Sequence, residues 1–89
     1  MNQSTETAHR PLSDIARDIR QHWKKVSPHA EPYLSAMEEL NSIRDMLYAD
    51  TAKSVVLYFL SKATGWRGEH ARATKAELKA IIKSTGYNI

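Results

Sequence analysis

The longest apolar run in this chain, six residues from Val55 to Leu60, constrains the fold more than any other feature. Because V-V-L-Y-F-L is rich in β-branched and aromatic residues, a buried strand is one interpretation. Ala52 and Ala63 flank the run and preserve a helical period, however, and no partner strand is found. We therefore predict a helix capped by Asp50 and ended at Thr64-Gly65. It is apolar around most of its circumference, so we expect the other elements to wrap it.

Apolar residues spaced three and four apart predict three further helices. The expected boundaries are a Ser13 cap and a Ser27-Pro28 stop for the first, a start between Pro28 and Pro32 for the second, and Gly68 or Glu69 to Gly86 for the last. The inward stripes are Leu12, Ile15, Ala16, Ile19, Trp23 and Val26; Ala30, Tyr33, Leu34, Met37 and Leu40; Ala52, Val55, Val56, Phe59, Leu60 and Ala63; and Ala71, Thr74, Leu78, Ile81 and Ile82.

The chain is predicted to be all-α, a compact bundle of four helices. A fifth short helical turn over 43–47 is expected, because Ser42 and Asp45 have the form of a capping box. Residues 1–10 show no apolar period and are predicted to be a disordered N-terminal lead. Residues 11–89 then form a single helical domain, since a chain of 89 residues leaves no room for a second core.

Composition argues against most chemistry. The absence of cysteine excludes disulfides, thiolate nucleophiles and cysteine-ligated metals. The four histidines show no metal-ligand spacing, and His22 is interpreted as a packed histidine at the edge of an apolar stripe. Asp14 and Asp18 are interpreted as helix charges partnered by Arg17 and Gln21. We therefore predict no enzyme activity, no catalytic residue, no cofactor and no metal site.

The expected location is the cytoplasm. The apolar run is too short to cross a membrane, so no membrane partner is expected. The N-terminus M-N-Q-S-T-E-T-A-H-R also lacks the basic-then-apolar order of a signal peptide.

Charge is unevenly distributed along the chain. Residues 1–29 carry five basic and three acidic groups, residues 30–50 one and five, and residues 51–89 seven and two. Two basic stripes lie opposite the predicted apolar stripes: Arg72, Lys75, Lys79 and Lys83 on the last helix, and Arg17, Arg20 and Lys24 on the first. Such stripes could neutralise phosphates, or they could be the solvated faces of amphipathic helices. Nucleic-acid binding is therefore the alternative function.

Protein binding is the leading function. Trp66 and Arg67, in the last predicted connection, belong to the residue types most enriched at interface hot spots. Packing of Trp66 onto the core is the other interpretation. Leu57 and Tyr58 are surplus apolar groups that could complete a patch for a partner, either a host protein or a second copy of the chain.

Four segments, P-L-S-D-I-A-R-D-I, P-Y-L-S-A-M, A-K-S-V-V-L-Y-F-L and W-R-G-E-H-A-R-A-T-K-A-E-L-K-A, cover much of residues 11–83. In these segments the chain resembles small, uncharacterised all-helical proteins of bacterial and phage (mobile-element) genomes. The resemblance implies a protein that binds and inhibits or redirects a host protein, such as a CRISPR nuclease or another defence factor. It implies no catalytic or cofactor residues.

Overall fold

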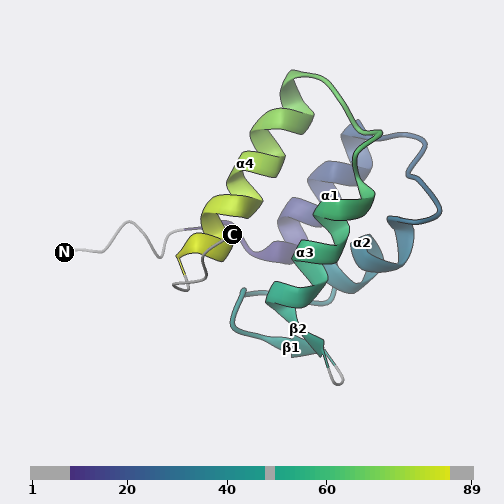
Figure 1. The fold of residues 1–89 in the computed structure, drawn as a ribbon. Helices are drawn as coiled ribbons and strands as arrows, with labels where there is room; N and C mark the ends of the chain where they lie inside the picture. Colours follow the sequence, from purple (N-terminus) through teal and green to yellow (C-terminus); the bar gives the residue numbers. More distant parts are fainter. Residues whose placement is uncertain (1–8, 48–49, 85–89) are drawn as a thin grey trace.

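The structure is a computed structural model that describes residues 9–47 and 50–84. Over these residues the chain forms four helices and one very short strand pair (Figure 1). The elements are α1 (Leu12–His22), α2 (Glu31–Met37), β1 (Met46–Leu47), β2 (Asp50–Thr51), α3 (Ala52–Lys62) and α4 (Glu69–Lys83). The predicted all-α class and four-helix bundle are confirmed. No helix in the described part of the chain is long and apolar enough to cross a membrane.

The core lies where the predicted stripes meet. α1 packs against α2 and α4, and α3 also packs against α2 and α4. Each predicted inward residue of α4 is buried, and Phe59 of α3 is completely buried. The expectation that the other elements wrap α3 is wrong, because Ser61 and Lys62 are exposed and Tyr58 is 53% exposed. α3 therefore forms one wall of the bundle and leaves one side in solvent.

The first helix is shorter than predicted and begins without a Ser13 cap. The N–H groups of Leu12 and Ser13 donate to the carbonyl oxygens of Asn41 and Leu40, at 2.9 and 2.8 Å. Main-chain groups beyond α2 therefore satisfy the start of α1 in place of a side chain. At its other end α1 stops at His22 rather than at Val26, because Trp23 leaves the helical conformation (φ −112°, ψ 88°).

The predicted fifth helical turn is wrong. Asp45 Oδ2 accepts from the N–H groups of Asn41 and Ser42, at 3.0 and 3.1 Å, as the capping-box pattern suggests. The Asp45 N–H donates to the Ser42 carbonyl at 3.0 Å and closes one turn. The chain then enters β1, which pairs antiparallel with β2. The capping residues therefore form an isolated turn.

Two turn residues differ from the sequence prediction. Asp50 lies in β2, and the cap of α3 is Thr51, whose Oγ1 accepts from the Ser54 N–H at 3.1 Å. Gly65 does not adopt the left-handed conformation expected of it. The glycine with positive φ is Gly68 (φ 109°), and α4 begins directly after it, as predicted. The predicted stop at Gly86 lies outside the described residues.

Arg10, in the segment before α1, contacts both α1 and α4. Of the predicted disordered lead, residues 1–8 lie outside the described residues. Arg10, however, donates to both carboxylate oxygens of Glu77 in α4, at 2.7 and 3.0 Å, and to Asp18 Oδ2 in α1, at 3.2 Å. Arg10 thus joins α1 to α4.

Candidate functional site

Trp66 is a core residue. Its side chain is buried, and its ring stacks on Trp23 with centroids 5.8 Å apart. It also packs edge to face with the His70 ring, with centroids 6.2 Å apart. The structure therefore supports core packing, one of the two interpretations that the sequence left open. The neighbouring Arg67 is exposed and has no ion-pair partner among the described residues.

Lys75 holds the connection between α3 and α4. Its ammonium group donates to the carbonyl oxygens of Ala63 and Trp66, both at 2.7 Å. Burial lowers the pKa of Lys75, and the nearby charges of Lys79 and Arg67 lower it further. Lys75 therefore turns inward and leaves the predicted basic stripe of α4.

The predicted basic stripe of α1 is largely neutralised. Arg20 donates to Glu31 at 2.9 Å and to Glu38 at 2.7 Å, so its guanidinium binds to α2. Arg17 pairs with Asp14 at 2.8 Å, within α1. Lys24 follows the end of α1, is exposed, and has no ion pair within the described residues.

The two predicted basic stripes do not form one surface. Arg20 faces α2, whereas Asp18 and His22 of α1 face α4. On α4, these contacts involve His70 and the Arg10-bound Glu77. These two residues lie on a flank of α4 different from the one that carries Lys79. The cations of α4 therefore stand apart from those of α1.

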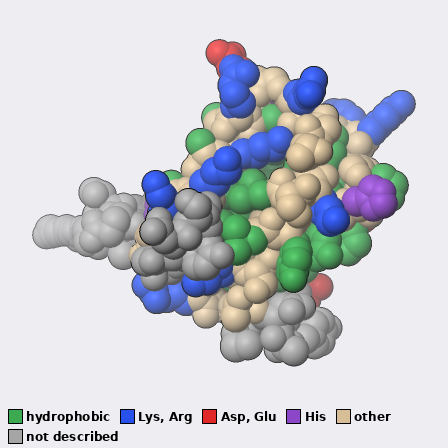
Figure 2. All heavy atoms as spheres, viewed as in Figure 1, with side chains coloured by type: hydrophobic (Ala, Val, Ile, Leu, Met, Phe, Trp, Pro, Cys, Tyr) green, Lys and Arg blue, Asp and Glu red, His purple; other side chains and the backbone are tan. Residues whose placement is uncertain are grey.

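A smaller set of cations on and next to α4 is exposed and unpaired within the described chain. We call it the basic face; it consists of Arg67, Arg72, Lys79 and Lys83. Lys and Arg side chains follow α4 in the view of Figure 2, where acidic side chains are few. The charges of Arg67 and Lys79 both lower the pKa of Lys75. Glu69, the first residue of α4, is an exposed carboxylate between Arg67 and Arg72, so the basic face is a region of net positive charge.

Tyr58 and Leu57 do not extend the basic face. The Tyr58 ring stacks on Tyr33 of α2 with centroids 5.4 Å apart, so it lies at the seam between α2 and α3. Leu57 is half-buried and packs on the core. The four residues predicted to bind a partner are therefore divided among the core, this seam and the basic face.

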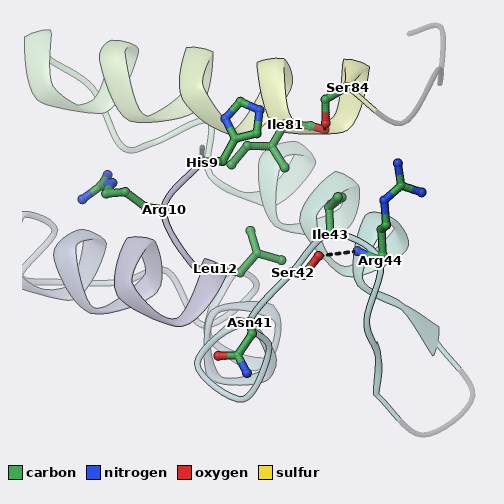
Figure 3. Close-up of a pocket in the computed structure, with 9 residues that line it drawn as sticks. All are labelled: His9, Arg10, Leu12, Asn41, Ser42, Ile43, Arg44, Ile81 and Ser84. Carbon is green, nitrogen blue, oxygen red and sulfur yellow. Dashed lines mark hydrogen bonds between the residues drawn. The ribbon is translucent and has the colours of Figure 1, made fainter. Parts of the chain in front are cut away.

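A pocket lies where the start of α1 meets residues 41–44 and the end of α4 (Figure 3). Its volume is about 200 Å³, smaller than the roughly 300–1,000 Å³ typical of small-molecule sites. Leu12, Ile43 and Ile81 supply apolar lining, and none of its lining residues is acidic. His9 Nε2 is buried there without a hydrogen-bond partner. The pocket therefore has no carboxylate for general acid–base chemistry.

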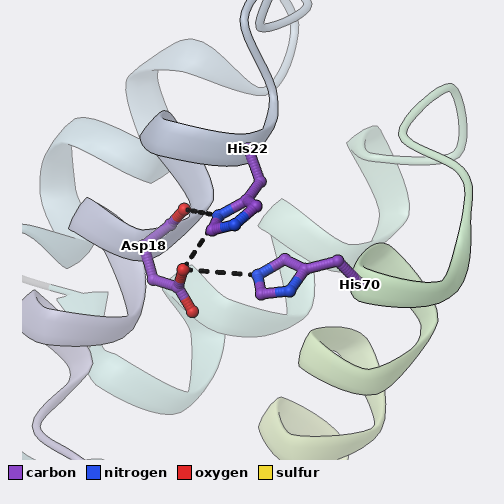
Figure 4. Close-up of side chains that lie close together, drawn as sticks. All are labelled: Asp18, His22 and His70. Atoms are coloured by element: carbon purple, nitrogen blue, oxygen red, sulfur yellow. Dashed lines mark hydrogen bonds and ion pairs between the residues drawn. The ribbon is translucent and has the colours of Figure 1, made fainter.

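Asp18, His22 and His70 form a polar cluster between α1 and α4 (Figure 4). Asp18 Oδ1 lies 3.0 Å from His22 Nδ1 and 3.3 Å from His70 Nε2. The two imidazole rings stack with centroids 3.7 Å apart. His22 Nδ1 also lies 2.9 Å from the Asp18 carbonyl oxygen. Side chains from two helices thus converge on one carboxylate oxygen.

The environment of Asp18 favours its charged form. Burial raises the pKa of this carboxyl group, but the hydrogen bond from Arg10 and the charges of His70, Arg10 and His22 outweigh burial and lower it. The predicted partner Arg17 is confirmed for Asp14, whereas Asp18 pairs with Arg10 rather than with Gln21. His22, interpreted as a packed histidine at the edge of an apolar stripe, packs against the His70 ring and leaves its side chain 45% exposed.

This cluster was not predicted from the sequence, although the spacing of two of its members is visible there. Asp18 and His22 are four residues apart, a spacing that places them on one side of a helix. His70 is remote in sequence and joins them only because α4 packs on α1. Spacing in the sequence alone therefore could not predict all three residues of the cluster.

No family model, no curated protein and no solved structure matches this chain.

Proposed function

We propose that this chain is a small non-enzymatic binding protein whose basic face docks on an acidic protein surface. The observation that supports the proposal is the exposure of Arg67, Arg72, Lys79 and Lys83 without an ion-pair partner in the described chain. Like charges held close together repel one another, and an acidic partner relieves that repulsion. Complementary charge also speeds encounter and fixes the orientation of binding.

The distribution of the acidic groups strengthens this proposal. Asp14, Asp18, Glu31 and Glu38 all pair with arginines of α1 or of the segment before it. Glu77 also pairs with Arg10. These five carboxylates are thus bound by arginines on and before α1. Glu39 and Glu69 are exposed without an ion pair among the described residues, and Glu69 lies at the start of α4, so the basic face keeps a net rather than a complete excess of positive charge for a partner. Two copies of this face would repel, so the proposed partner is a different protein, such as the host protein that the sequence resemblance suggests.

Nucleic-acid binding is the second candidate, and the geometry weakens it. Lys75 and Arg20 are bound to internal partners, which leaves fewer cations for phosphates. Proteins that bind single strands stack bases on exposed aromatic rings. Trp66 is buried, and Tyr58 lies at the seam with α2 rather than on the basic face. The basic face therefore offers charge without a stacking platform.

A capture experiment with charge-reversed variants tests the proposal. The immobilised full chain is incubated with nuclease-treated host lysate at physiological salt, and bound proteins are identified by mass spectrometry. We expect an acidic protein that the wild type retains and the Lys79→Glu/Lys83→Glu variant loses. The matched control is Lys24→Glu/Lys25→Glu, which changes the net charge equally at two exposed lysines after α1. Equal retention by both double variants would exclude the basic face as the docking site.

A gel shift between 25 and 250 mM salt separates the two candidates. If the four cations of the basic face bound duplex phosphates, log K would fall with log salt at a slope of about −3 to −4. We expect no shift even at the lowest salt. A clear shift that Lys79→Glu/Lys83→Glu abolishes and Lys24→Glu/Lys25→Glu preserves would favour nucleic acid over an acidic protein.

A further inference from the structure

We propose that Asp18, His22 and His70 bind a divalent transition-metal ion, Zn²⁺, between α1 and α4. This site lies on a flank of α4 different from the basic face and does not depend on the proposed docking function. Each residue supplies one ligand atom, and these atoms all lie within 4.8 Å of one another.

Two of the three ligand separations match those of a zinc site, and the third, between the two histidine nitrogens, is within 4.8 Å. Zinc binds imidazole nitrogen and carboxylate oxygen at about 2.0–2.2 Å in tetrahedral geometry, which places two ligand atoms about 3.3 Å apart. In this structure Asp18 Oδ1 lies 3.3 Å from His70 Nε2 and 3.0 Å from His22 Nδ1. An ion can therefore replace the contacts to Oδ1 without moving α1 relative to α4. The stacked rings must turn out of their parallel arrangement, and His22 Nδ1 must give up its 2.9 Å contact with the Asp18 carbonyl oxygen, so that both nitrogen lone pairs point at the ion.

The donor set selects the class of metal. Imidazole suits zinc, copper and nickel, whereas calcium and magnesium prefer sites made of oxygen ligands. The His22 and His70 side chains are 45% and 43% exposed, so an ion can enter from solvent and water can complete its coordination. Two histidines and one carboxylate with an open position are a known zinc ligand set.

Neighbouring groups hold the ligands in place. Arg10 donates to the other carboxylate oxygen of Asp18 at 3.2 Å, which fixes the carboxylate and leaves Oδ1 for the ion. The remaining contacts of Arg10 are with Glu77, which offsets its positive charge beside the site. The edge of the Trp66 ring packs against His70. Such outer contacts orient metal ligands and strengthen binding.

Zinc titration of the untagged, metal-free full chain tests the site. By calorimetry at pH 7.5 we expect one Zn²⁺ per chain. The ion would join α1 to α4, so its binding should stabilise the fold. At a free Zn²⁺ concentration ten times the Kd, we expect the melting temperature to rise by about 5–10 °C, and a chelator should reverse the rise. Co²⁺ should bind at the same site and give the visible absorption of tetrahedral cobalt.

Two ligand variants and one control decide the result. His70→Asn and His22→Asn should each weaken Zn²⁺ binding at least tenfold and remove the cobalt absorption, since even outer contacts contribute ten- to a hundredfold. His29→Asn should bind as the wild type does, because His29 is exposed and lies outside the cluster. Circular dichroism without metal confirms that each variant folds; if one does not, the other provides the test. Binding that survives both ligand variants, or no binding to the wild type, would overturn the proposal.

Discussion

Trp66 stacks on Trp23 with the two ring planes 11° from parallel. Trp23 is the residue at which α1 ends, and Trp66 lies in the connection between α3 and α4. The pair thus joins two points where the chain leaves a helix. Trp23 also contacts Phe59 edge to face, with centroids 6.3 Å apart, so the stack continues into the centre of the core.

Replacement of Trp66 should therefore destabilise the fold. Trp66→Ala removes a buried ring and its stacking partner, so we expect the free energy of unfolding to fall by about 3–5 kcal/mol. Trp66→Phe keeps an aromatic ring and should cost less. Urea denaturation of the three proteins measures both differences. An unchanged midpoint for Trp66→Ala would mean that this side chain is not part of the core.

Phe59 and Tyr58 are adjacent on α3, but their replacement by alanine should cost very different amounts of stability. Phe59 is completely buried, and Phe59→Ala should cost about 3–5 kcal/mol, much of the roughly 5–15 kcal/mol available to a domain. Tyr58 is 53% exposed, and its replacement by alanine should cost about 1 kcal/mol through loss of its stacking on Tyr33. Thermal melts by circular dichroism give the comparison. Equal losses for the two variants would contradict the described orientation of α3.

Lys75 and Lys79 lie one turn apart on α4, and their replacement should affect stability differently. Lys75→Met removes two hydrogen bonds to main-chain carbonyls of the α3–α4 connection, and we expect a loss of about 1–2 kcal/mol. Lys79→Met removes an exposed cation and should change stability by less than about 0.5 kcal/mol. Urea denaturation measures both. Amine-labelling reagents should likewise modify Lys79 faster than Lys75, and the reverse order would argue against the inward position of Lys75.

Stability should decline in acid partly through Glu31. Hydrogen bonds from Arg20 and Ser35 hold the pKa of Glu31 below its usual 4.5, against the opposing effect of burial. A carboxylate whose pKa is lower in the folded than in the unfolded state stabilises the fold above the unfolded pKa. That contribution is lost as the pH falls through the folded pKa. The free energy of unfolding should therefore decrease below about pH 4.5.

Glu31→Gln should weaken this pH dependence, since the variant has no carboxylate to protonate. Urea denaturation at pH 7, 4.5 and 3 measures the change. Asp18 also has a lowered pKa, so part of the acid sensitivity should remain. The matched control is Glu39→Gln at an exposed carboxylate without an ion pair among the described residues, and it should keep the wild-type profile. An identical profile for Glu31→Gln would remove Glu31 as a source of acid sensitivity.

Burial could be predicted from the sequence more reliably than element ends. Leu78 and Ile82 are buried where the helical period places them, because an apolar stripe must face a core whatever its neighbours are. Ser13 is not a cap, because carbonyls from a remote segment already accept the first amides of α1. Asp45 makes its local hydrogen bonds without starting a helix. Residue patterns within a segment therefore predicted hydrogen bonds within that segment, whereas tertiary packing determines where each helix begins and ends.

The cluster of Asp18, His22 and His70 could likewise be predicted only in part from the sequence. Asp18 and His22 share a helix face, and that could be predicted from their spacing. His70 and Arg10 reach Asp18 only after α4 and the segment before α1 take their places. The inward turn of Lys75 also depends on where the α3–α4 connection presents its carbonyls. Tertiary packing therefore creates both the candidate metal site and the final extent of the basic face.

The main-chain hydrogen bonds from Leu12 and Ser13 to Asn41 and Leu40 also affect the order of folding. The first turn of α1 gains these two bonds only after residues 40 and 41 have been synthesised and have reached it. During translation, α1 must therefore wait for the end of α2 before its N-terminus is complete. In the folded protein the same bonds join the start of α1 to residues 40 and 41, so the two segments should unfold locally together. The amides of Leu12 and Ser13 should exchange with solvent at a rate set by release of the residues that follow α2, rather than by fraying of α1 itself.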